Sequence, residues 1–209
     1  MAADTEDPRV TRSRGLILAA AAEIFLDFGF QSVSVDQVAE RAGIAKRTIY
    51  NLYGDKENLF RATILQSIAI AENFSTAIVT EVHTVGDPLA ELPEVAARLA
   101  ESVLSARVLP LRRLLVMESQ RFPDLVEEYR RRAPEAVMQA LADMFDDLTR
   151  QGLLRPAEPQ LLAEHFAFLA FGADLDRGMF SPAQICAPDI HDRAVAGAEA
   201  FLRAYAVDP

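Results

Sequence analysis

The 209-residue sequence predicts an all-α protein with two helical parts. Between its prolines and glycines, every long segment spaces apolar residues as a helix does, and none alternates in the period-2 pattern of a strand. In addition, residues 34–52 read as two short helices joined by a glycine-containing turn, which is the helix-turn-helix pattern. We therefore expect a polar tail at 1–10, a helix-turn-helix domain at 11–58 and a second helical domain at 59–209.

The first two helices are defined by glycines and by a cap. A helix is expected at 11–28, because its apolar residues recur at i, i+3 and i+4, and Gly29 would stop it. Ser34 is followed three residues later by Gln37, and this pair can satisfy the free backbone amides at a helix start reciprocally. A short second helix should follow and end at Gly43.

The third and fourth helices follow at once. The third is expected at 45–52, on the far side of the turn made by Gly43. Gly54 then breaks the chain, and Asp55 is placed to cap a long helix that runs from residue 56 to about 82 without Pro or Gly.

The positive charge of the chain is distributed unevenly. The formal net charge is −10, which argues against nucleic-acid binding if taken alone. Yet residues 61–209 contribute −8 of this charge, while 41–56 hold four basic side chains against one acidic. Both lysines of the chain, Lys46 and Lys56, bracket the third helix. This arrangement favours phosphate binding, since local charge within the screening length decides it; the alternative is that two lysines fall there by chance.

Catalytic and metal-binding patterns are missing from the sequence. The three histidines are far apart at 83, 165 and 191, and there is neither an H-E-x-x-H motif nor a Gly-rich phosphate loop. We expect no catalytic residues, no metal and no cofactor. The single Cys186, the lack of a leader and the lack of an apolar run of membrane-spanning length predict a cytoplasmic protein without membrane contact.

Residues 11–60 resemble the tetracycline-repressor (TetR/AcrR) family of bacterial transcription regulators. The resemblance is carried by A-x-x-I-F-x-x-x-G-F, S-V-x-Q-V-A, R-A-G-I and T-I-Y-x-x-Y-x-x-K-E-x-L-F. It implies an all-α homodimer whose third helix enters the major groove of double-stranded DNA. It also implies a separate C-terminal helical domain that binds a small molecule and dimerises.

The resemblance assigns DNA contacts to particular positions. The third helix would face DNA, Lys56 would contact a phosphate, and Ser34 would touch the backbone. The expected DNA-binding residues are Ser34, Lys46, Arg47, Thr48, Tyr50, Asn51 and Lys56. Ala45 and Leu52 depart from the family pattern, since many members have Ser and His there, and Arg47 replaces a frequent Gly or Pro. Arg47 could reach a guanine or a phosphate, with the phosphate slightly favoured; Tyr50 could instead be a core residue.

An effector site is expected in the C-terminal domain, by the same resemblance. Apolar side chains would line it and a few polar groups would orient the ligand. The expected ligand-binding residues are His83, Met117, Glu118, Phe122, Tyr129, Phe145, His165 and Phe168. The competing interpretation is that a stripe of Met and Phe at helical spacing forms the core, which is the more frequent case.

The last two helices are expected at about 159–177 and 189–206, with broad apolar faces. Small residues such as Ala194, Gly197 and Ala198 would let a neighbouring helix approach closely. We expect these two helices to form a two-fold dimer interface, the alternative being packing within one chain.

The expected function is a ligand-responsive DNA-binding regulator. A repressor that releases a palindromic operator when a small, largely apolar effector binds is the favoured form. The alternative is a DNA-binding regulator without a small-molecule effector, controlled by a protein partner or acting architecturally.

Overall fold

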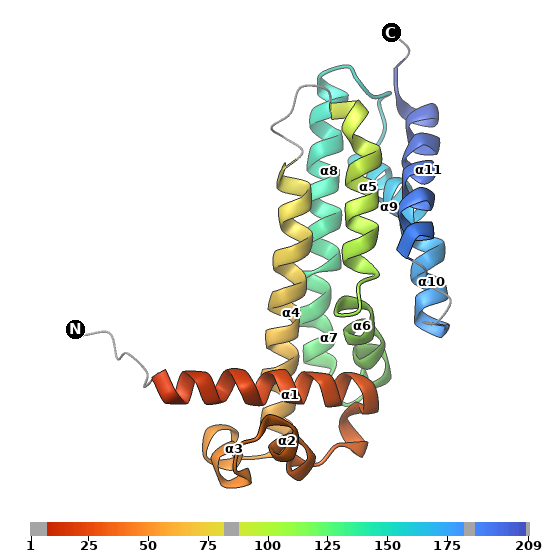
Figure 1. The fold of residues 1–209 in the computed structure, drawn as a ribbon. Helices are drawn as coiled ribbons and strands as arrows, with labels where there is room; N and C mark the ends of the chain where they lie inside the picture. The colour runs from red at the N-terminus through yellow and green to blue at the C-terminus, as the bar shows by residue number, and fades with distance from the viewer. Residues whose placement is uncertain (1–7, 82–87, 182–186, 208–209) are drawn as a thin grey trace, which may run out of the picture. The chain divides into compact units, whose positions relative to one another are not determined.

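The computed structural model describes residues 8–81, 88–181 and 187–207. Its helices are α1 (Pro8–Ser32), α2 (Val35–Ala42), α3 (Lys46–Tyr53), α4 (Lys56–Glu81), α5 (Pro88–Val103), α6 (Val108–Met117), α7 (Pro123–Arg132), α8 (Pro134–Arg150), α9 (Pro159–Ala167), the π-helix η2 (Phe168–Gly172), α10 (Ala173–Phe180) and α11 (Ala187–Tyr205) (Figure 1). Within those ranges, the only β pairing is an isolated bridge between Leu154 and Ala206. The predicted all-α class is confirmed. His83, Cys186 and most of the predicted tail lie outside the described residues.

The contacts divide the chain into two compact units. The first unit comprises residues up to Ala69 together with Pro110–Glu127, and the second comprises Ile70–Leu109 and Glu128 onward. The helix-turn-helix segment 11–58 thus shares its unit with most of α6 and the first half of α7. Helices α4, α6 and α7 each have residues in both units.

The glycines and the capping box predicted to bound the first two helices have these roles in the structure. The helical path of α1 is broken at Gly29, whose φ of 76° lies in the left-handed region that favours glycine. At the start of α2, Ser34 and Gln37 form the reciprocal capping box. Gly43 ends α2 with a φ of 64°, and its N–H donates to the carbonyls of Ala39 and Glu40.

Within the first unit, helix α3 has one fully buried residue. Ile49 is 1% exposed, so the opposite side of this short helix is left toward solvent. The following turn is ordered by Asp55, whose carboxylate accepts a hydrogen bond of 2.7 Å from the N–H of Asn58 at the start of α4. The predicted cap of the long helix is therefore confirmed.

The core of the first unit is aromatic. Four buried rings come from α1, α4 and the residue before α7, and their centroid separations range from 4.7 to 6.3 Å; they belong to Phe25, Phe30, Phe60 and Phe122. Phe25 and Phe30 stack, and the other pairs pack edge to face or tilted. By length and apolar composition alone, α1 could cross a membrane. Its residues Ile17, Ala21 and Phe25 are buried within this unit.

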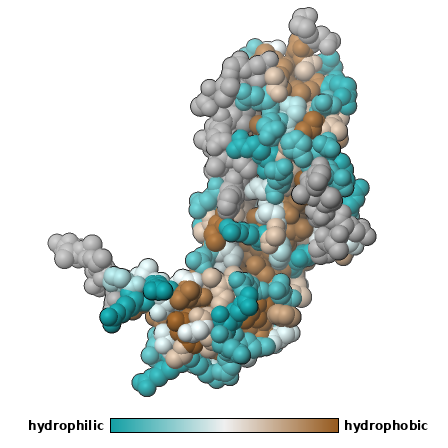
Figure 2. Space-filling view, viewed as in Figure 1, coloured by the Kyte–Doolittle hydropathy of each residue, from teal (hydrophilic) through white to brown (hydrophobic). Residues whose placement is uncertain are grey.

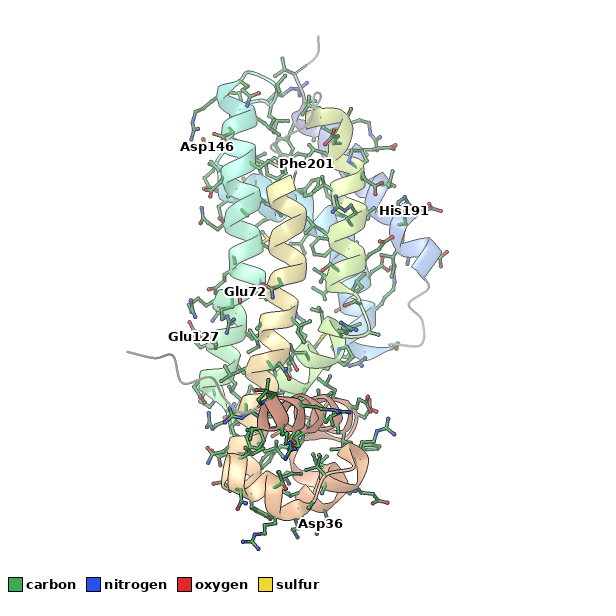
Figure 3. The ribbon with its side chains drawn as sticks, turned by 60° about the vertical axis from the view of Figure 1, so that its left-hand side comes forward. Asp36, Glu72, Glu127, Asp146, His191 and Phe201 are labelled. Carbon is green, nitrogen blue, oxygen red and sulfur yellow. The ribbon has the colours of Figure 1, made fainter. Side chains whose placement is uncertain are left out.

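The second unit is a helical bundle around another cluster of rings. Phe145 of α8, Phe166 of α9 and Phe201 of α11 have centroids 4.9 to 5.3 Å apart, and Phe201 points into the bundle (Figure 3). Helix α11 packs against α5 and the π-helix. The predicted last two helices are present, but the first of them continues through the π-turn to Phe180.

The small residues of α11 serve this intramolecular packing. Ala194, Gly197 and Ala198 are buried within their own chain. A Cβ built on Gly197 would lie 2.2 Å from the carbonyl oxygen of Leu169, so the two backbones touch at this point. The proposed use of these small residues for a partner helix is corrected: they are covered by the π-helix and α5 of the same protomer.

Candidate nucleic-acid interface

Helix α3 presents a polar, exposed face. Lys46, Arg47, Tyr50 and Asn51 are exposed, whereas Thr48 is half-buried. The spacing i, i+3 and i+4 puts the four exposed residues on the same side of the helix, opposite Ile49. Tyr50 is 42% exposed, so the alternative that it is a core residue does not hold. The face combines two cations, a phenol and an amide, the groups that bind phosphates and base edges.

The hydroxyl of Ser34 lies at the start of α2 and is exposed. It accepts a hydrogen bond of 3.3 Å from the N–H of Gln37, while the backbone N–H of Ser34 donates to Gln37 Oε1 at 2.7 Å. This capping fixes the helix start and leaves the oxygen accessible at the surface.

Lys46 is paired with a carboxylate of α2. Its Nζ lies 2.6 Å from Asp36 Oδ1, and the two side chains are 49% and 66% exposed. Asp36 lies on the outer surface of the helix-turn-helix (Figure 3). The hydrogen bond to Asp36 raises the pKa of Lys46, against a smaller opposing effect of burial. Part of the local positive charge is therefore neutralised before any phosphate arrives.

Arg47 differs from Lys46 in its interactions with other side chains. Its side chain is exposed and makes no hydrogen bond or ion pair with any residue that the structure describes. Ala45 precedes α3 without a side-chain capping bond, as expected from its departure from the family pattern. Arg47 is thus the cation on α3 that is available to a ligand.

Lys56 begins α4 and lies against the end of α1. Its Nζ donates a hydrogen bond of 3.3 Å to the carbonyl oxygen of Gln31 and lies 4.4 Å from the centroid of the Phe30 ring. Burial, followed by the nearby guanidinium of Arg121, lowers the pKa of Lys56. An anion at this ammonium would oppose both effects.

Two family models match this chain. Residues 17–63 match the model described as bacterial regulatory proteins of the tetR family, and residues 90–207 match the AefR-like transcriptional repressor C-terminal domain. The chain belongs to the TetR family. It is a DNA-binding transcription regulator, and not an enzyme.

Solved structures support the TetR-family fold over nearly the whole length. A protein from Mesorhizobium loti, described as a TetR-family transcriptional regulator, shares 27% identity and superimposes with a TM-score of 0.84 over 96% of this chain and 100% of that chain. The flavonoid-responsive regulator FrrA shares 25% identity with a TM-score of 0.65, over 95% of this chain and 100% of that one.

A curated relative matches only the DNA-binding part. The transcriptional activator FasR of Mycolicibacterium smegmatis is 36% identical over 61 residues, which are 29% of this chain and 27% of that protein. This likeness does not reach the C-terminal half.

The predicted effector residues fall in several environments. In the first unit, Met117 is 64% exposed, Phe122 is in the aromatic core, and Glu118 Oε1 accepts a hydrogen bond of 3.0 Å from the N–H of Phe30. In the second unit, Tyr129 and Phe145 are buried.

The remaining two described candidates are on the surface of the second unit. His165 is exposed on α9, and its Nδ1 lies 2.5 Å from the hydroxyl of Tyr205 on α11. Phe168, in the π-helix, is 71% exposed. Within the second unit, two of the described candidates are therefore buried and two are exposed.

The segment from α9 to α10 carries exposed apolar side chains. They are Leu161 at 41%, Phe168 at 71%, Leu169 at 49% and Phe180 at 82%. A contiguous exposed apolar patch marks a surface covered by a partner, so this segment is a candidate for such a surface.

Proposed function

We propose that this TetR-family protein is a homodimeric, ligand-responsive repressor that acts in the bacterial cytoplasm on a palindromic operator. The observation that carries the DNA-binding part is the face of α3, where Lys46, Arg47, Tyr50 and Asn51 are exposed around the buried Ile49. Together with Ser34, Thr48 and Lys56, these residues are the proposed DNA contacts. Arg47 contacts a phosphate or a guanine without first leaving a carboxylate.

Support for repression and for an effector comes from the C-terminal half. The model that matches residues 90–207 is described as a repressor domain, and FrrA is described as flavonoid-responsive. FasR is described as an activator, but its similarity to this chain covers only 61 residues of the DNA-binding part.

The proposed mechanism is thermodynamic linkage. An effector that binds the C-terminal domain favours a state in which the two recognition helices no longer match major grooves roughly 34–36 Å apart. Helix α4, which begins with Lys56 and has residues in both units, is the element proposed to transmit this change.

The proposed effector is largely apolar. Tyr129 is the polar group proposed to orient it, because its phenol belongs to a residue that is buried in the second unit. Phe145 is proposed to contribute from the aromatic core. Met117, Glu118 and Phe122 are proposed to respond to the effector through the first unit, where Glu118 and Phe122 contact α1 or its end.

The proposed dimer uses the segment α9 to α10 together with α11. Leu161, Phe168, Leu169 and Phe180 would be buried against their copies. Two-fold pairing of helices is the arrangement in which such a face covers itself.

Selection of duplexes from a random DNA pool tests the function. Recovery of a palindromic consensus supports a dimeric operator-binding regulator and gives the half-site spacing. Recovery of no preferred sequence contradicts the proposal. Lys56→Ala should weaken binding to the selected duplex and reduce its salt dependence.

A thermal-shift screen with apolar small molecules, flavonoids among them, tests the effector. A true effector raises the melting temperature, because it binds only the folded state, and also weakens operator binding. A protein that binds its operator but responds to none of these molecules would favour control by a protein partner.

A further inference from the structure

The turn between α6 and α7 is fixed against the end of α1. The N–H groups of Arg121 and Phe122 both donate to the carbonyl oxygen of Glu118 at 2.9 Å, which closes the turn. The carboxylate of Glu118 accepts the N–H of Phe30, and the ring of Phe122 lies 5.1 Å from that of Phe30. Arg121 therefore extends from a backbone that is held against the helix-turn-helix.

Two cations meet at the Phe30 ring. The guanidinium of Arg121 lies 4.2 Å from its centroid, and the ammonium of Lys56 lies 4.4 Å from it. The two charges are thus less than about 9 Å apart, within the Debye length at physiological salt. Their repulsion is one cause of the lowered pKa of Lys56.

Neither cation forms an ion pair with a carboxylate among the described residues, although the Glu118 carboxylate acts on Lys56 and partly opposes the lowering of its pKa. Lys56 donates only to a backbone carbonyl, and Arg121 stacks on the rings of Phe30 and Phe122. The nearby carboxylate of Glu118 accepts a backbone N–H. By contrast, Lys46 and Arg61 in the same unit are both paired with carboxylates. Two close cations with a single carboxylate nearby still repel each other, and they are stabilised when a further anion binds between or beside them.

The position of this pair connects it to DNA. Lys56 is bonded to Gln31, only three residues before Ser34, and both Lys56 and Ser34 are proposed contacts to the DNA backbone. We propose that Arg121 and Lys56 together bind operator phosphate, so that the DNA interface extends beyond the helix-turn-helix to the turn between α6 and α7. This inference rests on the phosphate contact proposed for Lys56.

The salt dependence of binding tests it with the full-length protein. Affinity for the selected operator, and for a random-sequence duplex, is measured between roughly 50 and 200 mM salt, where each phosphate contact contributes about 0.9 to the logarithmic slope. Arg121→Gln should reduce the slope by about 0.9 per bound subunit. Between the lowest and the highest salt concentration, the affinity of the variant should therefore fall by a factor about 3.5 times smaller, per lost contact, than the affinity of the wild type. Lys56→Gln should do the same, and Arg121→Lys should keep the wild-type slope.

Two further variants separate charge from structure. Arg121→Met keeps an apolar stem over Phe30 but lacks the charge, and should match Arg121→Gln. Arg150→Gln removes an exposed arginine from α8 in the second unit and should leave the slope unchanged.

A lowered melting temperature of the charge-free Arg121 variants with a wild-type slope would overturn the inference, since Arg121 would then only stack on Phe30. A change in the Arg121 variants without one in Lys56→Gln would overturn the shared site. Absence of salt-dependent DNA binding by the wild-type protein is a different result, because it would contradict the proposed function itself.

Discussion

At the scale of single residues, the cations of the recognition surface differ in whether a partner already holds them. Lys46 has Asp36 at 2.6 Å, whereas Arg47, one residue later, has no partner among the described residues. Exposed ion pairs of this kind are weak, contributing about 0–1 kcal/mol. A phosphate can therefore replace Asp36 as the partner of Lys46. Breaking the ion pair reduces the net contribution of Lys46 to the free energy of DNA binding.

Removing that carboxylate should strengthen DNA binding. We expect Asp36→Asn to raise affinity for duplex DNA, because Lys46 no longer leaves an ion pair and one repelling charge is lost. The matched control is Glu40→Gln, which removes an exposed carboxylate from the same helix without an ion pair to Lys46. The gain should be larger for Asp36→Asn, by about twofold, since an exposed ion pair is weak. A fluorescence-anisotropy titration measures both affinities. Equal affinities of the two variants would show that the ion pair between Lys46 and Asp36 does not oppose DNA binding.

The predictability of these residues depends on the distance over which they interact. The capping box of Ser34 and Gln37 is an interaction three residues apart within a single turn, so it follows from the sequence. The Lys46 pair joins two helices, and the contact of Arg121 with Phe30 joins residues 91 positions apart in the numbering. Such contacts depend on how the helices pack, and no local pattern marks Arg121.

At the scale of elements, the contact between α11 and the π-helix is set by a glycine. Gly197→Ala would bring a methyl carbon within 2.2 Å of the carbonyl oxygen of Leu169, and backbone on both sides limits relaxation. We expect a loss of about 1–3 kcal/mol of unfolding free energy. Gly15→Ala is the control, because nothing lies within 4 Å of its Cβ, and it should stabilise α1 by roughly 0.5–1 kcal/mol. Thermal unfolding that ranks both variants alike would contradict this close contact.

A buried carboxylate joins α10 to α11. Asp174 is 2% exposed and bonds to Arg193 at 2.8 Å and to Arg177 at 2.7 Å. Burial alone would raise its pKa, but the two guanidinium groups together lower the pKa below the ordinary value of 3.8.

The lowered pKa sets the sign of a pH dependence. A carboxylate with a depressed folded-state pKa stabilises the fold above its unfolded value and loses that contribution as the pH falls through the folded value. Asp174→Asn should therefore cost about 1.5–3 kcal/mol at neutral pH, as for hydrogen bonds to a charged group. The difference from wild type should shrink below pH of about 4 in denaturant unfolding. A constant difference across this range would show that the charge of Asp174 is unimportant.

Helix positions were predictable, but helix partners were not. Glycine stops at residues 29, 43 and 54 follow from local chemistry, and all three have positive φ. The small residues of α11 suit a close neighbour of any origin, and the structure shows that this neighbour is the π-helix of the same chain. For the same reason, apolar periodicity could not distinguish Phe122, in the core of the first unit, from a ligand-binding residue.

At the scale of the whole molecule, a net charge of −10 is compatible with DNA binding because the units differ in role. The visible surface mixes hydrophilic and hydrophobic residues (Figure 2). Four unpaired or weakly paired cations of the first unit are proposed to meet phosphate: Lys46, Arg47, Lys56 and Arg121. Phosphate binding depends on the charge within the Debye length of the contact, so the local positive charge of the first unit matters more than the sum over the chain.

Dimerisation determines whether two such surfaces act together. Phe168→Glu should shift the protein toward monomer, because it places a charge in the apolar set formed with Leu161, Leu169 and Phe180, and burial of an unpaired carboxylate is unfavourable. Phe28→Glu, at a similarly exposed phenylalanine of α1, should leave the oligomeric state unchanged. Sedimentation velocity over a range of concentrations measures both. Because a palindromic operator binds both subunits at once, the monomeric variant should lose most of its preference for the palindrome over one half-site. A Phe168→Glu protein that stays dimeric and keeps that preference would move the interface away from the segment between α9 and α10.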